Sequence, residues 1–430
     1  MKIAFYTLGC KVNTYETESI SKTFTDNGYL RVSYREFADV YIINTCTVTN
    51  QASAKSRKII RKLIKKNPEA VIAVMGCYSQ VAEEEISKID GVDIIIGTTH
   101  RERLFDLVQK VKSERIKIKE VIDVSRYLKF DEVNVTHFTE NTRAFLKIQD
   151  GCNHFCTYCI IPFARGRVRS RKSISILDEA KELVKNGYLE IVLTGIHTGG
   201  YGFDLENNSL YNLLKDLAAI KGLKRIRLSS IEMNEITEEI LQLYKTNKKF
   251  AKQLHLPLQS GSEEILKLMH RHYTLEEFRT KLAYIRKLIP GIAITTDVIV
   301  GFPGETEEQF EEMYNFIKEM EFSELHVFPF SKRNGTAAAL MKNQINGTVK
   351  SVRVNKLLTL NEELATKFIN DSVNVTQSVI FESCDDLYSY GHSSTYIKLK
   401  VPKDVKLTNK LVFVDIVNVK YQDSLGQIKK

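Results

Sequence analysis

Three cysteines lie close together in the stretch DGCNHFCTYCIIPFARGR, at Cys152, Cys156 and Cys159. Thiolates gathered on one loop are typical of a metal or iron–sulfur site. A 4Fe–4S cluster that only carries electrons takes four cysteines, so three would leave one iron open to an exchangeable ligand. Zinc is the alternative, because His154 lies inside the loop and could complete a Cys3His site. The spacing alone leaves both possibilities open.

Three further cysteines each follow a short apolar run: Cys10 after KIAFYTLG, Cys46 after VYIINT and Cys77 after AVIAVMG. Apolar runs that alternate with amphipathic helical patterns, with DIIIG as the fourth, predict a parallel sheet with helices on its faces. The C-terminal ends of such strands share one edge, where open α/β folds bind ligands. We therefore expect a shared ligand site there, and three buried structural cysteines are the alternative.

A second α/β pattern follows a polar connection. Its apolar runs end near Gln149, Thr194, Ser229, Pro257, Val300 and Phe330. Six strand–helix repeats predict a barrel, or part of one, that is smaller than a complete eightfold barrel. Functional groups should lie at the C-terminal ends of its strands. The three-cysteine loop and the glycine-containing loops GIHTGGYG, HLPLQSGS and VIVGFPGET all fall at such ends.

The chain is therefore predicted to be an α/β protein with a small β domain added. Residues 1–122 form an N-terminal parallel-sheet domain, and residues 138–371 form a partial (β/α)6 barrel with a helical connector. Residues 372–430 contain short β-rich runs such as VTQSVIFE and LVFVDIVNVKYQ, which predict a small C-terminal β-barrel. Cys384 stands alone in this last part and is expected to be a small structural residue.

Composition narrows the class of protein. A hydrophobic content of 43% and a charged content of 27% are those of an ordinary globular protein. The N-terminus lacks the apolar core of a signal peptide, and no apolar run approaches the roughly 18 residues of a membrane span. We expect a cytoplasmic protein that does not engage a membrane. In a reducing compartment its 7 cysteines suit metal or catalytic sites better than disulfides.

The three-cysteine loop resembles that of the radical S-adenosylmethionine superfamily. The resemblance rests on C-x3-C-x2-C after the first strand of a partial barrel, with Tyr158 before the third cysteine. It implies a 4Fe–4S cluster on Cys152, Cys156 and Cys159, with S-adenosyl-L-methionine chelating the open iron. This favours iron–sulfur over zinc.

A closer resemblance, to the methylthiotransferases, spans essentially the whole chain. It rests on blocks in the family's order, namely TLGCKVNTYETE, INTCTVT, VMGCYSQ, PFARGRVRSR, LTGIHTGGYG, LPLQSGS, DVIVGFPGET and FPFSKRNGT. It implies that Cys10, Cys46 and Cys77 hold a second 4Fe–4S cluster, also with an open iron. These enzymes replace a C–H bond by C–S–CH3, with S-adenosyl-L-methionine as both radical source and methyl donor. No catalytic residue beyond the cluster ligands is predicted.

The substrate is expected from the same resemblance. The words TLGCKVN, YETE, INTCTVT and PFARGR resemble the branch that methylthiolates C2 of N6-threonylcarbamoyladenosine at position 37 of tRNA. The alternatives are a methylthiotransferase acting on isopentenyladenosine-37 of tRNA or on a ribosomal-protein aspartate. A non-catalytic RNA-binding protein with metal sites as structural staples is an alternative of another class. The C-terminal β-barrel resembles the RNA-binding TRAM module of these enzymes.

Further residues and partners complete the prediction. For the S-adenosylmethionine pocket we expect strand-end residues, namely Gly195, Ser230, Gln259 and Asp297. For RNA or the threonyl carboxylate we expect arginines, because they bind anions in a bidentate manner: Arg165, Arg167, Arg169, Arg171 and Arg333. The basic helix KSRKIIRKLIKK could follow phosphates or be a solvated face. Expected partners are the tRNA anticodon loop, an electron donor such as flavodoxin or ferredoxin, and a sulfur source.

Overall fold

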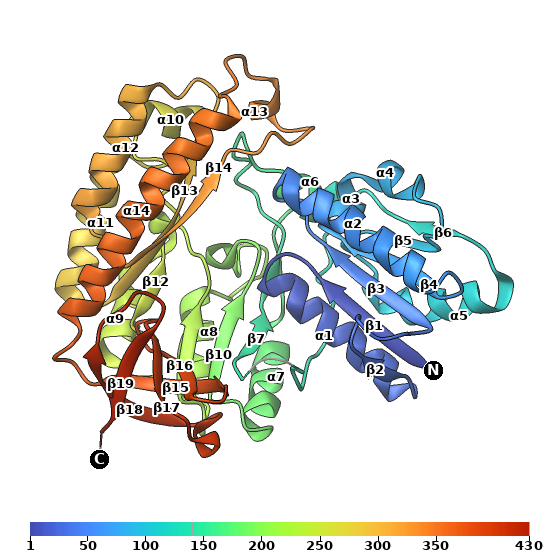
Figure 1. The fold of residues 1–430 in the computed structure, drawn as a ribbon, viewed down its shortest axis with the longest axis horizontal. Coiled ribbons are helices and arrows are strands. Elements are labelled where there is room, and N and C mark those ends of the chain that lie inside the picture. The colour runs from blue at the N-terminus through green and yellow to red at the C-terminus, as the bar shows by residue number, and fades with distance from the viewer. Residues whose placement is uncertain (140–141, 430) are drawn as a thin grey trace.

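A computed structural model describes residues 1–139 and 142–429 of the chain. Two α/β domains lie side by side, and a small β-barrel closes the C-terminal end against the second of them (Figure 1). The fold class predicted from the sequence is confirmed. Among the described residues, no helix is both long enough and apolar enough to cross a membrane.

The N-terminal domain is built on a six-stranded parallel sheet in the order β2-β1-β3-β4-β5-β6. Its strands are β1 (Lys2–Thr7), β2 (Leu30–Val32), β3 (Val40–Thr45), β4 (Val71–Gly76), β5 (Ile94–Ile96) and β6 (Ile118–Glu120). The four predicted runs become β1, β3, β4 and β5, and short strands are added at both edges. Every residue of β3 and β4 is buried, because helices cover both faces of the sheet.

Helices on the two faces of this sheet form two separate apolar cores. On one face lie α1 (Lys11–Asp26) and α5 (Leu104–Glu114), and on the other lie α2 (Asn50–Lys66) and α4 (Glu83–Ser87). The short α3 (Cys77–Val81) begins directly after β4. In α2, the apolar residues Ile59, Ile60 and Leu63 recur at helical spacing and are buried. The basic residues of that helix therefore lie mainly on its outer face.

The second domain is a partial barrel made of two three-stranded parallel sheets. Their strands are β7 (Ala144–Lys147), β10 (Glu190–Thr194), β11 (Arg225–Leu228), β12 (Gln253–His255), β13 (Ala293–Val300) and β14 (Glu324–Pro329). A parallel bridge between Ile226 and Phe250 links the two sheets. A small antiparallel pair, β8 (Gln149–Asp150) and β9 (Arg169–Ser170), flanks the three-cysteine loop. All six predicted strand ends are found within about two residues of their expected positions.

The outer layer of the barrel is helical. It contains α6 (Ile161–Arg165), α7 (Ser173–Lys185), α8 (Leu210–Ala219), α9 (Glu238–Thr246), α10 (Glu263–Leu268), α11 (Leu275–Leu288), α12 (Glu307–Met320) and α13 (Ala337–Leu340). Ser or Thr side chains cap the start of several of these helices, and Thr274 and Thr306 form full capping boxes with residues three positions later. Such caps satisfy backbone N–H groups that have no partner within the helix.

The connector and the C-terminal domain complete the fold. The long helix α14 (Gly347–Asp371) packs along β14 and contributes Leu357, Leu360 and Leu364 to the barrel core. A closed barrel follows, in the order β15-β16-β17-β19-β18. Its strands are β15 (Gln377–Cys384), β16 (Tyr388–Ser393), β17 (Lys398–Pro402), β18 (Leu411–Asn418) and β19 (Ser424–Ile428). Closure leaves no unpaired strand edge.

Cys384 departs from its expected environment. It is the last residue of β15 and is exposed to solvent. It takes no part in the apolar interior of the barrel, which on this strand contains Val379 and Phe381, so its exposure does not favour the predicted structural role.

Candidate active site between the two α/β domains

The first three cysteines lie where three neighbouring strands end. Strands β3 and β4 are paired up to their last residues, and Cys46 and Cys77 follow immediately. Strand β1 lies on the other side of β3, and Cys10 comes shortly after it. A Cβ on Gly9 would lie 3.3 Å from the Cβ of Cys46, so the first loop closely approaches the second. The strand pattern thus brings these cysteines together at one edge of the sheet.

An arginine from the second domain reaches this group of cysteines. The Nε of Arg165 donates to the Sγ of Cys77 at 3.1 Å. Burial raises the pKa of Cys77 to about 12, while the positive charge of Arg165 acts in the opposite direction. Burial also raises the pKa of Cys46. A metal bound to these thiols would have to displace their protons, and the nearby guanidinium would favour that step at Cys77.

The second group of cysteines, Cys152, Cys156 and Cys159, lies on a loop that begins at a glycine with a left-handed backbone. Gly151 precedes it with φ +74°, and a Cβ there would lie 1.8 Å from the carbonyl oxygen of Arg167. Only glycine fits this position. The backbone N–H of Cys159 donates to the carbonyl of Cys156 at 2.9 Å, which curls the loop. Burial raises the pKa of Cys152 to about 11 and that of Cys159 to about 12.

A second arginine lies beside this loop. The Nη1 of Arg271 is 3.6 Å from the Sγ of Cys156, and the same guanidinium pairs with Glu232. Tyr158 packs against the small buried cluster that contains Phe302. Each group of cysteines thus has an arginine in contact with one of its sulfur atoms.

The spacing of the sulfur atoms bears on the choice between zinc and an iron–sulfur cluster. A tetrahedral zinc ion holds four sulfurs about 3.8 Å apart, because each Zn–S bond is about 2.3 Å. Among the described residues, only two groups of three or more possible metal ligands have their ligand atoms within 4.8 Å of one another, and neither group contains a cysteine. A 4Fe–4S cluster binds each thiolate to a different iron and so needs wider spacing. The cysteines present fit such a cluster.

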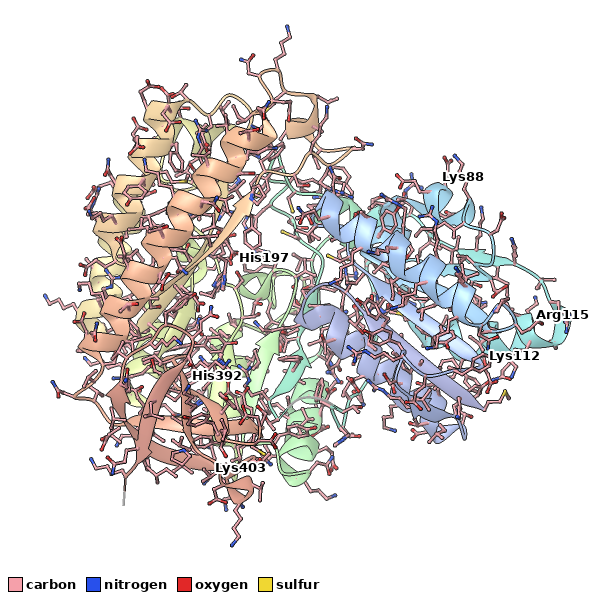
Figure 2. All side chains as sticks on the ribbon, viewed as in Figure 1. Lys88, Lys112, Arg115, His197, His392 and Lys403 are labelled. Atoms are coloured by element: carbon pink, nitrogen blue, oxygen red, sulfur yellow. The ribbon has the colours of Figure 1, made fainter. Side chains whose placement is uncertain are left out.

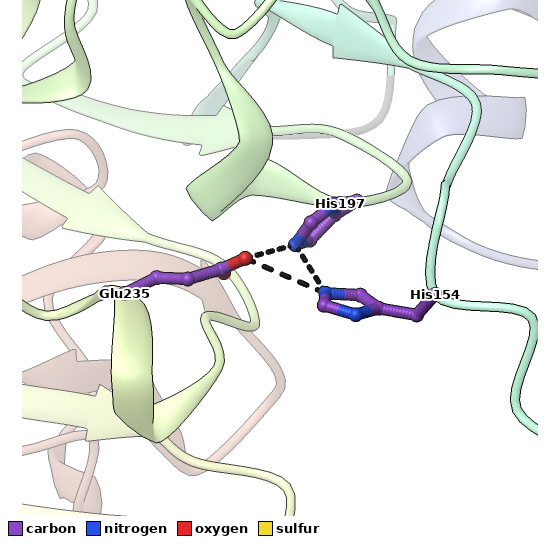
Figure 3. A group of neighbouring side chains, drawn as sticks. All are labelled: His154, His197 and Glu235. Atoms are coloured by element: carbon purple, nitrogen blue, oxygen red, sulfur yellow. Dashed lines mark hydrogen bonds and ion pairs between the residues drawn. The ribbon is translucent and has the colours of Figure 1, made fainter. Parts of the chain in front are cut away.

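His154 is engaged by other partners than the cysteines of its loop. Its Nε2 lies 2.9 Å from the Nε2 of His197 and 3.4 Å from the Oε1 of Glu235, and His197 also contacts Glu235 (Figure 3). Burial alone would raise the pKa of Glu235, but its hydrogen bonds to the two histidines hold that pKa at about 2. These contacts occupy His154 and do not favour a Cys3His zinc site. The sequence analysis did not identify this group, although GIHTGGYG contains one member.

A cavity of about 560 Å³ lies between the first group of cysteines and the strand ends of the barrel. Cys10 contributes to its wall from the N-terminal domain. Three of the four residues predicted for the S-adenosylmethionine pocket also line it, namely Gly195, Ser230 and Asp297. Gln259 is not part of this lining, because its backbone pairs with Asp297 and Ile299 along β13. The three lining residues are therefore the stronger candidates for ligand binding.

The same cavity contains polar residues that the sequence analysis did not identify. They are Lys11, Arg143, Arg227, His255, Glu324, His326 and Tyr396. His255 is the last residue of β12, so the strand-end rule could have found it, whereas His326 lies within β14. Burial lowers the pKa of Lys11, as do Arg143 and Arg227, whereas Tyr396 raises it. Tyr396 comes from the C-terminal barrel, so all three domains contribute to this wall.

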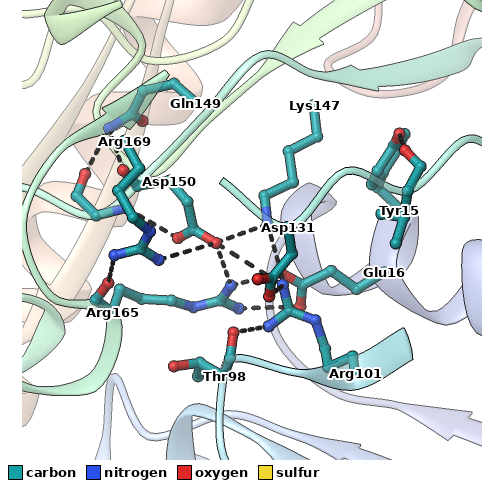
Figure 4. Close-up of polar contacts among 12 residues, drawn as sticks. Tyr15, Glu16, Thr98, Arg101, Asp131, Lys147, Gln149, Asp150, Arg165 and Arg169 are labelled. Atoms are coloured by element: carbon teal, nitrogen blue, oxygen red, sulfur yellow. Dashed lines mark hydrogen bonds and ion pairs between the residues drawn. The ribbon is translucent and has the colours of Figure 1, made fainter. Parts of the chain in front are cut away.

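A buried network of charges joins the two α/β domains (Figure 4). At its centre, Glu16 of α1 accepts from Lys147 at 2.8 Å and from Arg165 at 2.5 Å, and it pairs with Arg101 at 3.1 Å. Burial alone would raise the pKa of Glu16, but these three cations hold it at about 2. Asp150 pairs with Lys147 and Arg165, and the same cations lower its pKa. The network thus holds the domain that contains the first group of cysteines against the domain that contains the second.

Most of the arginines predicted to contact RNA prove to be internal. Arg165, Arg169 and Arg171 are almost completely buried, and carboxylates or backbone carbonyls of this chain bind their guanidinium groups. Arg333 is bound by side chains of the N-terminal domain, including Thr47 at 2.6 Å. These internal contacts do not favour substrate binding by the four arginines, and that role stays a prediction. Arg167 is exposed and remains a candidate.

Several charged side chains lie on the outer surface, away from this buried network. Figure 2 shows Lys88, Lys112 and Arg115 at the outer edge of the N-terminal domain, whereas His197 lies centrally between the domains. Lys403 marks the outer side of the C-terminal barrel in the same view.

Two family models match this chain. Residues 2–97 match the Uncharacterized protein family UPF0004, and residues 146–317 match the Radical SAM superfamily. Together they include both groups of cysteines. The match to the radical S-adenosylmethionine superfamily covers most of the partial barrel and stops before β14.

Solved structures support the fold. The radical S-adenosylmethionine methyltransferase TsrM from Kitasatospora setae has a TM-score of 0.58 and 15% identity, covering 79% of this chain and 77% of its own. The cobalamin-dependent S-adenosylmethionine radical enzyme OxsB has a TM-score of 0.51 and 14% identity, covering 85% of this chain and 56% of its own. At such identities these structures establish the arrangement of the elements and nothing more specific.

Curated relatives are much more similar in sequence. Threonylcarbamoyladenosine tRNA methylthiotransferase MtaB of Bacillus subtilis (strain 168) is 47% identical, covering 99% of this chain and 96% of its own. The protein of the same name from Aquifex aeolicus (strain VF5) is 41% identical, covering 86% and 90%. A tRNA-2-methylthio-N(6)-dimethylallyladenosine synthase of Clostridium botulinum (strain Langeland / NCTC 10281 / Type F) is 40% identical, covering 84% and 81%. With such identity along nearly its whole length, this chain belongs to the radical S-adenosylmethionine tRNA methylthiotransferases.

Proposed function

We propose that this protein methylthiolates C2 of N6-threonylcarbamoyladenosine at position 37 of tRNA. The observation that carries the proposal is the 47% identity to the Bacillus subtilis threonylcarbamoyladenosine tRNA methylthiotransferase, which extends over 99% of this chain. The relative named for dimethylallyladenosine is less similar and is matched over less of the chain. Membership of the radical S-adenosylmethionine family implies a 4Fe–4S cluster and S-adenosyl-L-methionine. When bound, they supply the radical chemistry that protein side chains lack.

Two clusters are part of this proposal. Cys152, Cys156 and Cys159 would hold the first, and the S-adenosylmethionine pocket would include Gly195, Ser230 and Asp297 at the nearby strand ends. The other three cysteines, Cys10, Cys46 and Cys77, would hold the second. Support comes from the convergence of three strand ends on these three thiols and from the buried Arg165 beside Cys77. Both groups use three cysteines, which leaves an iron open to an exchangeable ligand in each.

The chain's own residues would bind and orient the reactants. The buried network around Glu16 holds the two domains in fixed relation, which keeps the two proposed clusters at a constant separation. The cavity beside Cys10 would accept the base of nucleotide 37 after it leaves the anticodon stack, since enzymes that modify a base extrude it into a pocket. Arg167 is the arginine that we retain for contact with RNA.

Partners and location follow from this activity. The tRNA anticodon loop is the substrate, with the C-terminal barrel as the RNA-binding module at 372–430. The domains at 1–122 and 138–371 carry the proposed clusters. An electron donor such as flavodoxin or ferredoxin and a sulfur source complete the reaction, and tRNA modification of this kind takes place in the cytoplasm.

The experiment is mass spectrometry of tRNA nucleosides from a host that lacks its own methylthiotransferases, with and without this gene. We expect 2-methylthio-N6-threonylcarbamoyladenosine only when the gene is present. A methylthiolated isopentenyladenosine in its place, or a methylthiolated aspartate found by mass spectrometry of the host's ribosomal proteins, would keep the chemistry and refute the substrate. If no methylthio product of any kind appeared, a non-catalytic RNA-binding protein would be the better explanation.

A further inference from the structure

Lys11 stands apart from the other cations that line the cavity beside Cys10. Arg143 pairs with Glu382 at 3.1 Å, and Arg227 pairs with Glu190 at 2.8 Å. Within residues 1–139 and 142–429, Lys11 has no ion pair or side-chain hydrogen bond of its own, and its side chain is accessible to solvent. A positive charge without a partner in a concave wall is suited to bind an anionic ligand.

The acidic residues of the cavity do not neutralise this charge. Only Asp297 and Glu324 among the lining residues are acidic. Asp297 lies 3.2 Å from the Nε2 of His255, and Glu324 accepts a hydrogen bond from Tyr421 at 3.0 Å. Both carboxylates are therefore engaged elsewhere. Lys11 is also the first residue of α1, where the positive end of the helix dipole adds to the attraction for an anion.

The opposite wall is built with some backbone strain. Tyr396 has φ +68°, a left-handed conformation that a bulky residue adopts only when its surroundings hold it there. Its ring stacks on His392, and the guanidinium groups of Arg143 and Arg227 lie 5.4 Å and 4.8 Å from its centre. The ring is thus fixed in a cationic part of the cavity. An aromatic face beside positive charge suits a ligand that combines a flat base with an anionic group.

We propose that Lys11 binds the carboxylate of the threonylcarbamoyl group and so selects this nucleoside over one with an apolar N6 substituent. The inference rests on the proposed function and names a specificity-determining residue for it. An isopentenyl group would leave the ammonium without a partner in the occupied cavity, which is costly. The carboxylate instead forms a charge-assisted hydrogen bond in a partly enclosed site.

The test compares two synthetic anticodon stem–loops that differ in one group. One carries N6-threonylcarbamoyladenosine at position 37, and the other carries the same nucleoside with its threonine carboxylate converted to the carboxamide. The measured quantity is the ratio of kcat/KM for the acid to that for the amide. Loss of cluster from part of a preparation cancels in this ratio, which matters because Lys11 follows Cys10.

We expect the wild-type protein to prefer the acid by about tenfold or more, the size of a hydrogen bond to a charged group. Lys11→Gln should bring the ratio close to one, mainly through a higher KM for the acid. Lys11→Arg keeps the charge and should retain most of the preference. Lys22→Gln is the matched control, since Lys22 lies on the same helix but pairs with Asp26 at its solvent face.

The other outcomes are equally informative. If Lys11→Gln keeps the wild-type ratio, Lys11 does not read the carboxylate and the inference is wrong. If Lys11→Gln lowers kcat/KM equally for the two stem–loops, Lys11 binds an RNA phosphate or the carboxylate of S-adenosyl-L-methionine. That result also overturns the inference. If the wild-type protein modifies neither stem–loop, the proposed function fails and the inference fails with it.

Discussion

Arg165, which belongs to the second domain, contacts three side chains of the first domain at once. Its Nε donates to the Sγ of Cys77, while its two terminal nitrogens contact Glu16 at 2.5 Å and Asn13 at 2.8 Å. The planar guanidinium presents five N–H donors in a fixed geometry, whereas a lysine would offer a single charged point. One residue therefore connects a proposed cluster ligand to the charge network between the domains.

At this scale the two-cluster proposal can be tested on the cysteines themselves. Replacing Cys10, Cys46 and Cys77 together by Ala should remove about half of the iron and acid-labile sulfide from anaerobically reconstituted protein, because one of two sites is lost. Iron per chain, determined by a colorimetric assay, is the measurement. Cys384→Ala is the control and should leave iron unchanged, since that cysteine is exposed and alone. Full iron in the triple variant would show that these cysteines hold no cluster.

Strands β10 and β11 carry charges that attach the C-terminal barrel. Arg225 and Arg227 alternate with apolar residues on β11 and point to the same side, where both meet Glu190 of β10. The two guanidinium groups also donate to backbone carbonyls of the C-terminal barrel, such as that of Ser378 at 2.8 Å. Burial opposes ionisation of Glu190, yet the arginines hold its pKa at about 2. The partial barrel is thus built to receive the small domain.

Glu190→Gln should weaken this contact strongly, because it leaves two buried arginines without a counter-charge. Loss of one partner of a buried ion pair costs about 3–5 kcal/mol. We expect a fall of that order in the free energy of unfolding in urea, together with faster proteolysis between α14 and β15. Glu182→Gln removes the same charge from an exposed pair on α7 and should change stability by less than about 1 kcal/mol. Equal effects of the two variants would contradict this role for Glu190.

On the scale of the whole molecule, buried carboxylates hold all three domains together. Glu16 connects the first domain to the second, and Glu190 connects the second to the third. The pKa of each is lowered to about 2, which means that the folded protein stabilises the ionised form of each carboxylate relative to the unfolded chain. Their contribution to stability is present above the pKa of an unfolded glutamate, about 4.3. It is lost as the pH falls from there to about 2.

We therefore expect the free energy of unfolding of the metal-free protein to fall between about pH 4.3 and pH 2, by roughly 3 kcal/mol for each of these two groups. Urea titrations at pH 6, 4 and 3 measure it. The difference between wild type and Glu190→Gln should narrow as the pH falls, since protonation removes the same charge as the substitution. A difference that stays constant over this range would show that the charge of Glu190 does not stabilise the interface.

Several features of the fold and site follow from local sequence alone. Buried apolar runs predicted the strands of both α/β domains, and the six strands of the partial barrel end within about two residues of the predicted positions. The rule that parallel strand ends share an edge predicted that Cys10, Cys46 and Cys77 converge, and it also identified Gly195, Ser230 and Asp297 as cavity residues. These features depend on the spacing of apolar residues and on the direction of the strands, and short stretches of sequence determine both.

Only the tertiary structure decided which charges are internal and which face a ligand. The sequence around Arg165, Arg169 and Arg171 is typical of an exposed anion-binding segment. Packing of the first domain against the barrel instead buries these arginines, where they pair with Glu16, Asp150 and Glu179, respectively. Lys11 and Tyr396, far apart in the sequence, meet in one cavity because three domains close around it. Such pairings depend on contacts between distant elements, and no local pattern encodes them.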